Sequence, residues 1–198
     1  MRPIEPSIID DIFEALDRQI SVRDGTPLGL VVCGGTALSA LGLVMRTTKD
    51  VDILGMVLET QNKRAIQSIT KFPEWLLEAA NKVGRDFDLP ENWLNLGPAS
   101  QVESGLPEGF EKRLVKKVYG QYLTVYFISR LDQIHFKLYA AVDQNDYHVQ
   151  DLFALKPTES EMEMAAKWVI TQDVSEVFKA LLRDFLETHD HGSIAKRI

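Results

Sequence analysis

The first part of the chain shows apolar residues at helical spacing, followed by an uninterrupted apolar run. Between residues 7 and 23 the apolar positions recur three or four apart, which predicts an amphipathic helix with Ser7 and Asp10 as its N-terminal cap. The run Leu28–Val32 is typical of a strand that is covered on both faces. The pattern then predicts a short helix at residues 36–41. This order favours an α/β or α+β core.

The rest of the chain adds a second strand, a hairpin and several helices. In chain order we expect a strand from Val51 to Leu54 or Leu58, a helix over 61–83 with a break near Phe72-Pro73, an irregular segment over 89–109, a hairpin formed by 114–119 and 121–128, helices over 131–142, 158–170 and 174–188, and a loose tail from His189. Thr158 and Glu161, directly after Pro157, predict the start of the helix at 158.

The predicted fold class is therefore α/β (α+β), with a mixed sheet flanked by helices and a helical C-terminal part. We expect residues 1–130 to form the core together with the N-terminal helix. Residues 131–198 are expected to pack on that core as a single unit, because no linker between the two parts is rich in Gly, Ser or Pro.

Composition places the chain among ordinary globular proteins. Its 198 residues are 45% hydrophobic and 26% charged, which is enough apolar content for a sizeable core. The net charge of −7 and the lack of a long basic run argue against a sequence-independent grip on duplex nucleic acid. A single cysteine, Cys33, excludes an internal disulfide framework and a cysteine-based zinc site. No apolar leader or membrane-spanning run is present, so we expect a cytoplasmic protein without a membrane partner.

The glycine pair after the first predicted strand carries the first chemical signal. Gly34 and Gly35 lack a Cβ, so the backbone there can turn sharply and approach a ligand closely. The helix after them presents free N–H groups and a partial positive charge, which favour a phosphate. Thr36 is placed to cap this helix or to add a hydroxyl contact. Arg46, in the following loop, is placed to form paired hydrogen bonds with a triphosphate.

The second signal is a pair of acids on the next strand. Alternate residues of a strand face the same side, so we expect Asp50 and Asp52 to project together while Val51 and Ile53 point into the core. Two adjacent carboxylates repel each other unless a proton or a cation lies between them. Hard oxygen ligands suit Mg²⁺ or Mn²⁺, and a pair of such ions about 4 Å apart can activate a hydroxyl and stabilise a leaving pyrophosphate.

Together these residues carry a family resemblance. Gly34-Gly35, 14 intervening residues and Asp50-Val51-Asp52 resemble the signature of the DNA polymerase β-like nucleotidyltransferase superfamily. The longer string GGTALSALG…RTTKDVDIL is similar to a bacterial branch akin to the abortive-infection and toxin–antitoxin nucleotidyltransferases. In that branch a Lys-Leu-x-Ala helix and then an Asp-Leu element follow the core. Here Lys137-Leu138-Tyr139-Ala140 and Asp151-Leu152 fit this order, so the likeness covers residues 28–155.

The resemblance implies a protein that binds a nucleoside triphosphate together with Mg²⁺ or Mn²⁺. It implies the following roles: Asp50 and Asp52 as catalytic metal ligands, Gly34, Gly35 and Thr36 as phosphate-holding residues, Arg46 and Lys137 as cations that meet the phosphates, and Asp151 as a participant in acid–base chemistry. Members usually have a third carboxylate on a later strand, but the strand expected here, Tyr122–Phe127, contains no acid. Asp88, Glu111 and Asp132 are the acids that remain as replacements in space.

Several of these residues also have a purely structural interpretation. In these interpretations Arg46 pairs with Asp50 or Asp52, Lys137 is solvated, Asp151 caps a helix, Asp86-Phe87-Asp88 forms a surface turn, Cys33 is a small buried side chain, and Trp93 packs in the core instead of stacking on a base. The basic cluster formed by Lys112, Arg113, Lys116 and Lys117 is either a solvated hairpin face or an electropositive patch for nucleic acid such as a tRNA end.

The leading functional hypothesis is a nucleotidyltransferase that moves a nucleoside monophosphate from a triphosphate to a hydroxyl of RNA, protein or a small molecule. The alternative is a non-catalytic nucleotide-binding or toxin–antitoxin regulatory module on the same fold, a hypothesis motivated by the missing third acid. A third hypothesis is an interaction protein whose C-terminal helices dock a partner. The sequence specifies no oligomeric state.

Overall fold

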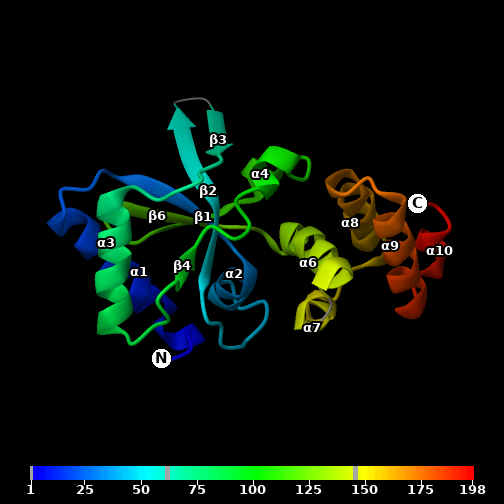
Figure 1. The fold of residues 1–198 in the computed structure, drawn as a ribbon, viewed down its shortest axis with the longest axis horizontal. Coiled ribbons are helices and arrows are strands. Elements are labelled where there is room, and N and C mark those ends of the chain that lie inside the picture. The colour runs from blue at the N-terminus through cyan, green and yellow to red at the C-terminus, as the bar shows by residue number, and fades with distance from the viewer. Residues whose placement is uncertain (1, 61–62, 145–146) are drawn as a thin grey trace. The chain divides into compact units, whose positions relative to one another are not determined.

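The computed structural model describes residues 2–60, 63–144 and 147–198. The chain divides into two units, Met1–Ser129 and Arg130–Ile198 (Figure 1). The expected packing of the C-terminal part on the core as one unit stays a prediction.

A mixed sheet forms the frame of the first unit. Its strands are β1 (Leu28–Cys33), β2 (Val51–Thr60), β3 (Lys63–Gln67), β4 (Leu94–Asn95), β5 (Val115–Val118) and β6 (Leu123–Phe127). The order is β3-β2-β1-β6-β5, with β4 paired to β2. The central strand, β1, is antiparallel to β2 and parallel to β6. The expected mixed sheet, with β1, β2 and the β5–β6 hairpin where the apolar runs predicted them, is confirmed.

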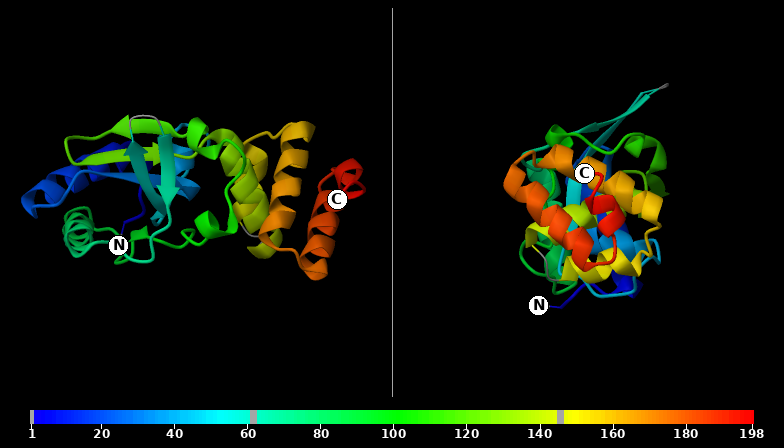
Figure 2. Two further views of the ribbon diagram at one scale, coloured as in Figure 1. Left: turned by 90° about the horizontal axis from the view of Figure 1, so that it is seen from above. Right: turned by 90° about the vertical axis from the view of Figure 1, so that its right-hand side faces the viewer.

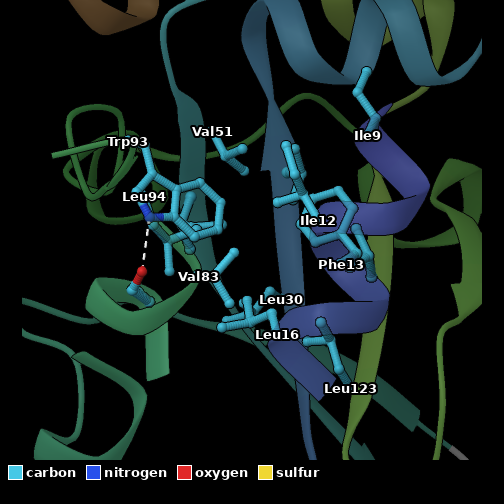
Figure 3. Close-up of a cluster of buried hydrophobic side chains, with 14 of the residues drawn as sticks. Ile9, Ile12, Phe13, Leu16, Leu30, Val51, Val83, Trp93, Leu94 and Leu123 are labelled. Atoms are coloured by element: carbon cyan, nitrogen blue, oxygen red, sulfur yellow. Dashed lines mark hydrogen bonds between the residues drawn. The ribbon is translucent and has the colours of Figure 1, made fainter. Parts of the chain in front are cut away.

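The helices of the first unit supply most of the remaining core. They are η1 (Pro6–Ile8), α1 (Ile9–Val22), α2 (Gly34–Ala40), α3 (Glu74–Asp86), α4 (Gln101–Ser104) and α5 (Phe110–Arg113). Apolar side chains of α1 and α3 pack with one face of the sheet (Figure 3). Val51 and Ile53 are both buried in this core, as their spacing predicted. The residues that alternate with them therefore face the other side of β2.

The start of the first helix differs from the sequence prediction. Helix α1 begins at Ile9 with Ile8 as its N-cap and without a side-chain cap, so the cap predicted at Ser7 is wrong. The turn of 3₁₀-helix at Pro6–Ile8 already leads the chain into α1 and replaces that cap.

The helix predicted over 61–83 is wrong in its first half. Residues 63–67 form β3, which pairs antiparallel with β2, and residues 61 and 62 lie outside the described part of the chain. The β2–β3 hairpin extends beyond the rest of the sheet (Figure 2). Cross-strand pairing overrides local helical spacing here. The helix α3 begins only after Pro73, where the fixed φ angle and the missing N–H of proline are tolerated.

The second unit is entirely helical in its described residues. Its helices are α6 (Arg130–Gln144), α7 (Tyr147–Ala154), α8 (Glu159–Gln172), α9 (Glu176–Thr188) and α10 (Gly192–Ala195). The capping box of Thr158 and Glu161 is confirmed. Arg130 forks onto the Glu161 carboxylate at 2.6 and 3.2 Å and lowers the pKa of Glu161 to about 2.

The tail after α9 is not loose as predicted. It forms α10, in which Ile194 and Ala195 are buried, so these two apolar side chains hold the end of the chain in place. The helix α7 was not predicted either. Among the helices of the described residues, none combines the length and apolar character that a membrane crossing requires.

A buried carboxylate joins α1 to the β5–β6 hairpin. Asp17 is 9% exposed, and its Oδ1 accepts hydrogen bonds from the backbone N–H groups of Tyr122 (2.8 Å) and Leu123 (2.7 Å). The same carboxylate lies against the Cα of Gly120, where a Cβ would overlap it.

We expect Asp17→Ala to lower the free energy of unfolding by about 2–4 kcal/mol, because it leaves two backbone donors without their charged acceptor. Urea denaturation measures the change. The control is Glu14→Ala on the exposed side of α1, which loses only a 3.7 Å surface pair with Arg18 and should change the free energy by about 0.5 kcal/mol or less. Equal effects of the two substitutions would contradict the role of Asp17.

Candidate functional site

The glycine turn lies where β1 passes into α2. Helix α2 begins at Gly34, so both glycines belong to its first turn, earlier than the start predicted at Thr36. Its N-cap is Cys33, and no side chain caps the helix, so the capping role predicted for Thr36 is wrong. The buried Thr36 hydroxyl instead donates to the backbone oxygen of Asp50 at 2.7 Å. This bond ties the glycine turn to the start of the acid-bearing strand.

The carboxylate of Asp52 lies directly on the glycine turn. Cys33 and Asp52 are paired in the β1–β2 register. Gly34 has a φ of +66°, and a Cβ at this position would overlap Oδ2 of Asp52. Glycine is therefore required twice, for its left-handed backbone and for the space that the carboxylate fills. The first glycine and the second acid, 18 residues apart in the sequence, meet at one point.

Asp50 lies just before β2 and is held by a neighbouring hydroxyl. Its Oδ1 accepts a hydrogen bond from Thr48 Oγ1 at 3.2 Å, and the buried Thr48 forms an isolated bridge with Ile4. The loop that leads to Asp50 also covers the second glycine. A Cβ at Gly35 would meet Arg46 Nη2 and Thr48 Oγ1, each at 2.9 Å.

Six of the predicted site residues therefore occupy one neighbourhood of the first unit: Gly34, Gly35, Thr36, Arg46, Asp50 and Asp52. Thr48 belongs to the same neighbourhood and was missed by the sequence prediction. The only signal for it was a hydroxyl residue two positions before the first acid. The neighbourhood combines two carboxylates, one guanidinium and a sharp backbone turn without side chains.

The other two predicted residues, Lys137 and Asp151, form a buried pair in the second unit. Lys137 Nζ lies 2.8 Å from Asp151 Oδ2, and their side chains are 5% and 3% exposed. His148 Nδ1 lies 3.4 Å from the same Nζ, and the Tyr147 ring lies 5.5 Å away. The interpretation of Lys137 as a solvated lysine is therefore wrong. Asp151 pairs with a cation inside α7 and does not cap it. The predicted contact of both residues with a nucleotide stays a prediction.

In the described part of the chain, no third acid joins Asp50 and Asp52 in a group that could hold a metal ion. The strand expected to carry it, β6, pairs with β1 on the side away from β2. Within residues 2–60, 63–144 and 147–198, no group of three or more His, Cys, Asp or Glu side chains is arranged to hold a metal ion. Besides β1, the strand that pairs with β2 at Asp52 is the short β4, and its residue opposite Asp52 is Asn95.

Two residues and one motif with open interpretations prove to be structural. Trp93 is 1% exposed and its Nε1 donates to Ala80 O at 2.9 Å, so its ring packs in the core and base stacking is excluded (Figure 3). Cys33 is a small buried side chain, as predicted. The Asp86–Asp88 motif is the expected turn: Asp86 ends α3 and pairs with Lys82, and Asp88 has a left-handed φ of 54°.

The basic hairpin face is exposed, and its lysines are paired with acids. Lys117 lies 2.7 Å from Asp10, and Lys116 lies 3.3 Å from Glu59. Glu59 also accepts hydrogen bonds from Arg64 and Tyr126, and these bonds, with Arg64 the strongest, lower the pKa of Glu59 to about 2. Lys112 and Arg113, the other two residues of the predicted cluster, end α5 before the hairpin begins. The acid partners of Lys116 and Lys117 offset charge on the hairpin, which favours a solvated face there over a nucleic-acid patch.

The fold and the site agree with the comparison to known families. Residues 10–165 match the family described as nucleotidyltransferase of unknown function (DUF6036). The match spans most of the chain, including β1, α2 and β2, so the chain belongs to this nucleotidyltransferase family. No curated protein and no solved structure matches it.

We expect Gly34→Ala to destabilise the protein more than Gly42→Ala does. Both glycines have nearly the same left-handed φ, +66° and +65°, so alanine costs about 1–2 kcal/mol at either position. At Gly42 a Cβ meets nothing within 4 Å, whereas at Gly34 it displaces Asp52 and adds about 1–3 kcal/mol. Urea denaturation of both variants measures the difference in the free energy of unfolding.

A double-mutant cycle then assigns the difference to the carboxylate. In an Asp52→Ala background the extra cost of Gly34→Ala should fall to the cost of Gly42→Ala. An extra cost that persists without the carboxylate would contradict the close approach.

Proposed function

We propose that the protein transfers a nucleoside monophosphate from a nucleoside triphosphate to a hydroxyl acceptor, in the manner of the DNA polymerase β-like nucleotidyltransferases. The observation that carries this proposal is the position of the Asp52 carboxylate on the Cα of Gly34. It joins a turn suited to phosphate and a strand suited to a cation in one site. Family membership supports the general reaction class but not the acceptor, which is RNA, a protein or a small molecule in this proposal.

The residues at the site fit a divalent cation. Mg²⁺ is usually bound by one or two carboxylates, with waters and substrate phosphates as its remaining ligands. Asp50 and Asp52 supply the carboxylates, and the missing Cβ of Gly34 provides the space that the Asp52 carboxylate occupies. Mg²⁺ or Mn²⁺ bound there would neutralise charge on the triphosphate and lower the pKa of a hydroxyl.

The side chains and backbone of the site have separate tasks in this proposal. The turn at Gly34 and Gly35 lets the backbone N–H groups of α2 approach the phosphates, and Arg46 offers a planar donor pair to their oxygens. Thr36 and Thr48 position Asp50 through its backbone oxygen and its carboxylate. Catalysis of this kind depends on positioning and electrostatic stabilisation.

We expect transfer to depend on both acids. The protein is incubated with α-labelled triphosphates, Mg²⁺ or Mn²⁺, and acceptors that include tRNA and protein. Combining Asp50→Asn with Asp52→Asn should lower transfer by about 100-fold or more. The matched control combines Asp24→Asn with Asp190→Asn, two exposed acids at left-handed positions that asparagine tolerates, and should keep full activity. Transfer that survives in the first variant would eliminate the proposed mechanism.

A second candidate function is a non-catalytic nucleotide-binding module, such as the regulatory half of a toxin–antitoxin pair. It is favoured because, among the described residues, no third acid joins Asp50 and Asp52 in a group that could hold a metal ion. Calorimetry with a non-hydrolysable triphosphate and Mg²⁺ separates the two candidates. Binding without transfer supports the module, and a lack of binding contradicts both.

A further inference from the structure

The long segment between α3 and α4 brings one polar side chain to the acid pair. Its short strand β4 pairs parallel with the start of β2, so that Leu94 lies opposite Val51 and Asn95 lies opposite Asp52. The Val51 N–H donates to Trp93 O at 2.5 Å and fixes this register. The expected irregular segment is therefore ordered at the point where it passes the site.

The register of the β2–β4 pair determines which face of the sheet Asp52 and Asn95 project from. Residues that are directly paired in neighbouring strands project from the same face of a sheet. Val51 and Leu94 are 1% and 7% exposed and lie in the core with Trp93 (Figure 3). Asp52 and Asn95 therefore share the opposite face, on which the Asp52 carboxylate meets Gly34.

A buried anchor keeps this short strand in place. Two residues of strand are too few to be stable alone. The Trp93 ring, one residue before β4, is buried and held by its bond to Ala80 O. It packs so closely on α3 that a Cβ at Gly84 would lie 3.1 Å from the ring. The position of Asn95 therefore depends on a rigid core contact.

The amide group of Asn95 is oriented as a donor. Its Oδ1 accepts the Gly97 N–H at 2.8 Å, and this bond assigns the oxygen and the NH₂ group of the amide. Because Oδ1 is turned toward the Gly97 N–H, the NH₂ group is the part of the amide that is turned away from this bond. An NH₂ group next to a metal-binding acid suits an oxygen of the substrate.

We propose that Asn95 binds the nucleotide, donating a hydrogen bond from Nδ2 to a phosphate or ribose oxygen. This inference rests on the proposed function, and it assigns an uncharged donor to the place beside Asp52. The nucleotide, and not the metal ion, is the group that Asn95 recognises.

Two substitutions separate the donor from the turn. Asn95→Asp keeps Oδ1 as the acceptor for Gly97 N–H, so the turn is retained, but it removes the donor and adds a negative charge. Asn95→Ala removes both the donor and the acceptor for the Gly97 N–H. The control is Asn92→Asp, an exposed residue of the same segment with the same change of charge. Urea denaturation confirms that each variant is folded before binding is measured.

Calorimetry with a non-hydrolysable triphosphate and Mg²⁺, and separately with Mn²⁺ alone, provides the test. We expect Asn95→Asp to weaken triphosphate binding by about tenfold or more without weakening Mn²⁺ binding, and Asn92→Asp to change neither by more than about twofold. Unchanged triphosphate affinity in folded Asn95→Asp would overturn the inference. Stronger Mn²⁺ binding with unchanged or stronger triphosphate binding would also overturn it, because position 95 would then act as a metal-ligand position.

The same titrations distinguish this inference from the proposed function. If the wild-type protein does not bind the triphosphate, both fail. In a second case, the wild type binds the triphosphate and Asp52→Asn abolishes this binding. If both Asn95 variants then bind the triphosphate normally, only the inference about Asn95 fails. If Asn95→Ala does not fold, Asn95→Asp still decides the question.

Discussion

The carboxylate of Asp52 packed on the Cα of Gly34 determines much of the architecture around it. The contact requires a residue without a Cβ in a left-handed conformation, and it requires β1 and β2 to pair with Cys33 opposite Asp52. The loop between α2 and β2 folds back over Gly35, where Arg46 and Thr48 lie against the turn. The Asp52 carboxylate thus accounts for Gly34, and the side chains of the loop account for Gly35.

Sequence reasoning succeeded where the information was local. The apolar runs predicted β1 and the start of β2, and the spacing of the glycines and acids predicted that they would meet. The C-terminal helices followed from periodicity and from the capping residues Thr158 and Glu161. In each case the controlling interaction lies within a few residues or within one strand pair, so the pattern of side chains along the chain reports it.

The sequence predictions were wrong where contacts between distant segments determine the structure. Strand β3 has helical spacing but follows the edge of β2, and α10 is held by the burial of Ile194 and Ala195 in contacts that no local pattern encodes. Asn95 was missed for the same reason. Its position beside Asp52 follows from the register of a two-residue strand more than 40 residues away in the chain, and that register depends on the burial of Trp93.

The buried pair of Lys137 and Asp151 stabilises the second unit. It links α6 to α7 inside the second unit, and breaking a buried ion pair by removing one partner costs about 3–5 kcal/mol. Substitution of Lys137 or Asp151 is therefore expected to lower the free energy of unfolding. Asp50 and Asp52, in contrast, are each only partly buried.

The parallel pairing of β1 with β6 has a consequence for how the chain assembles. The antiparallel β1–β2 contact joins segments about 20 residues apart in the sequence. The parallel β1–β6 contact pairs Leu28 with Leu123, so β1 gains β6 as its second neighbour only after a much longer part of the chain has been made. Long loops are slow to close, and parallel contacts form late in folding. During synthesis, the glycine turn and the acids can therefore come together while one edge of β1 still lacks its strand, and that edge is open to wrong pairing until the hairpin emerges from the ribosome.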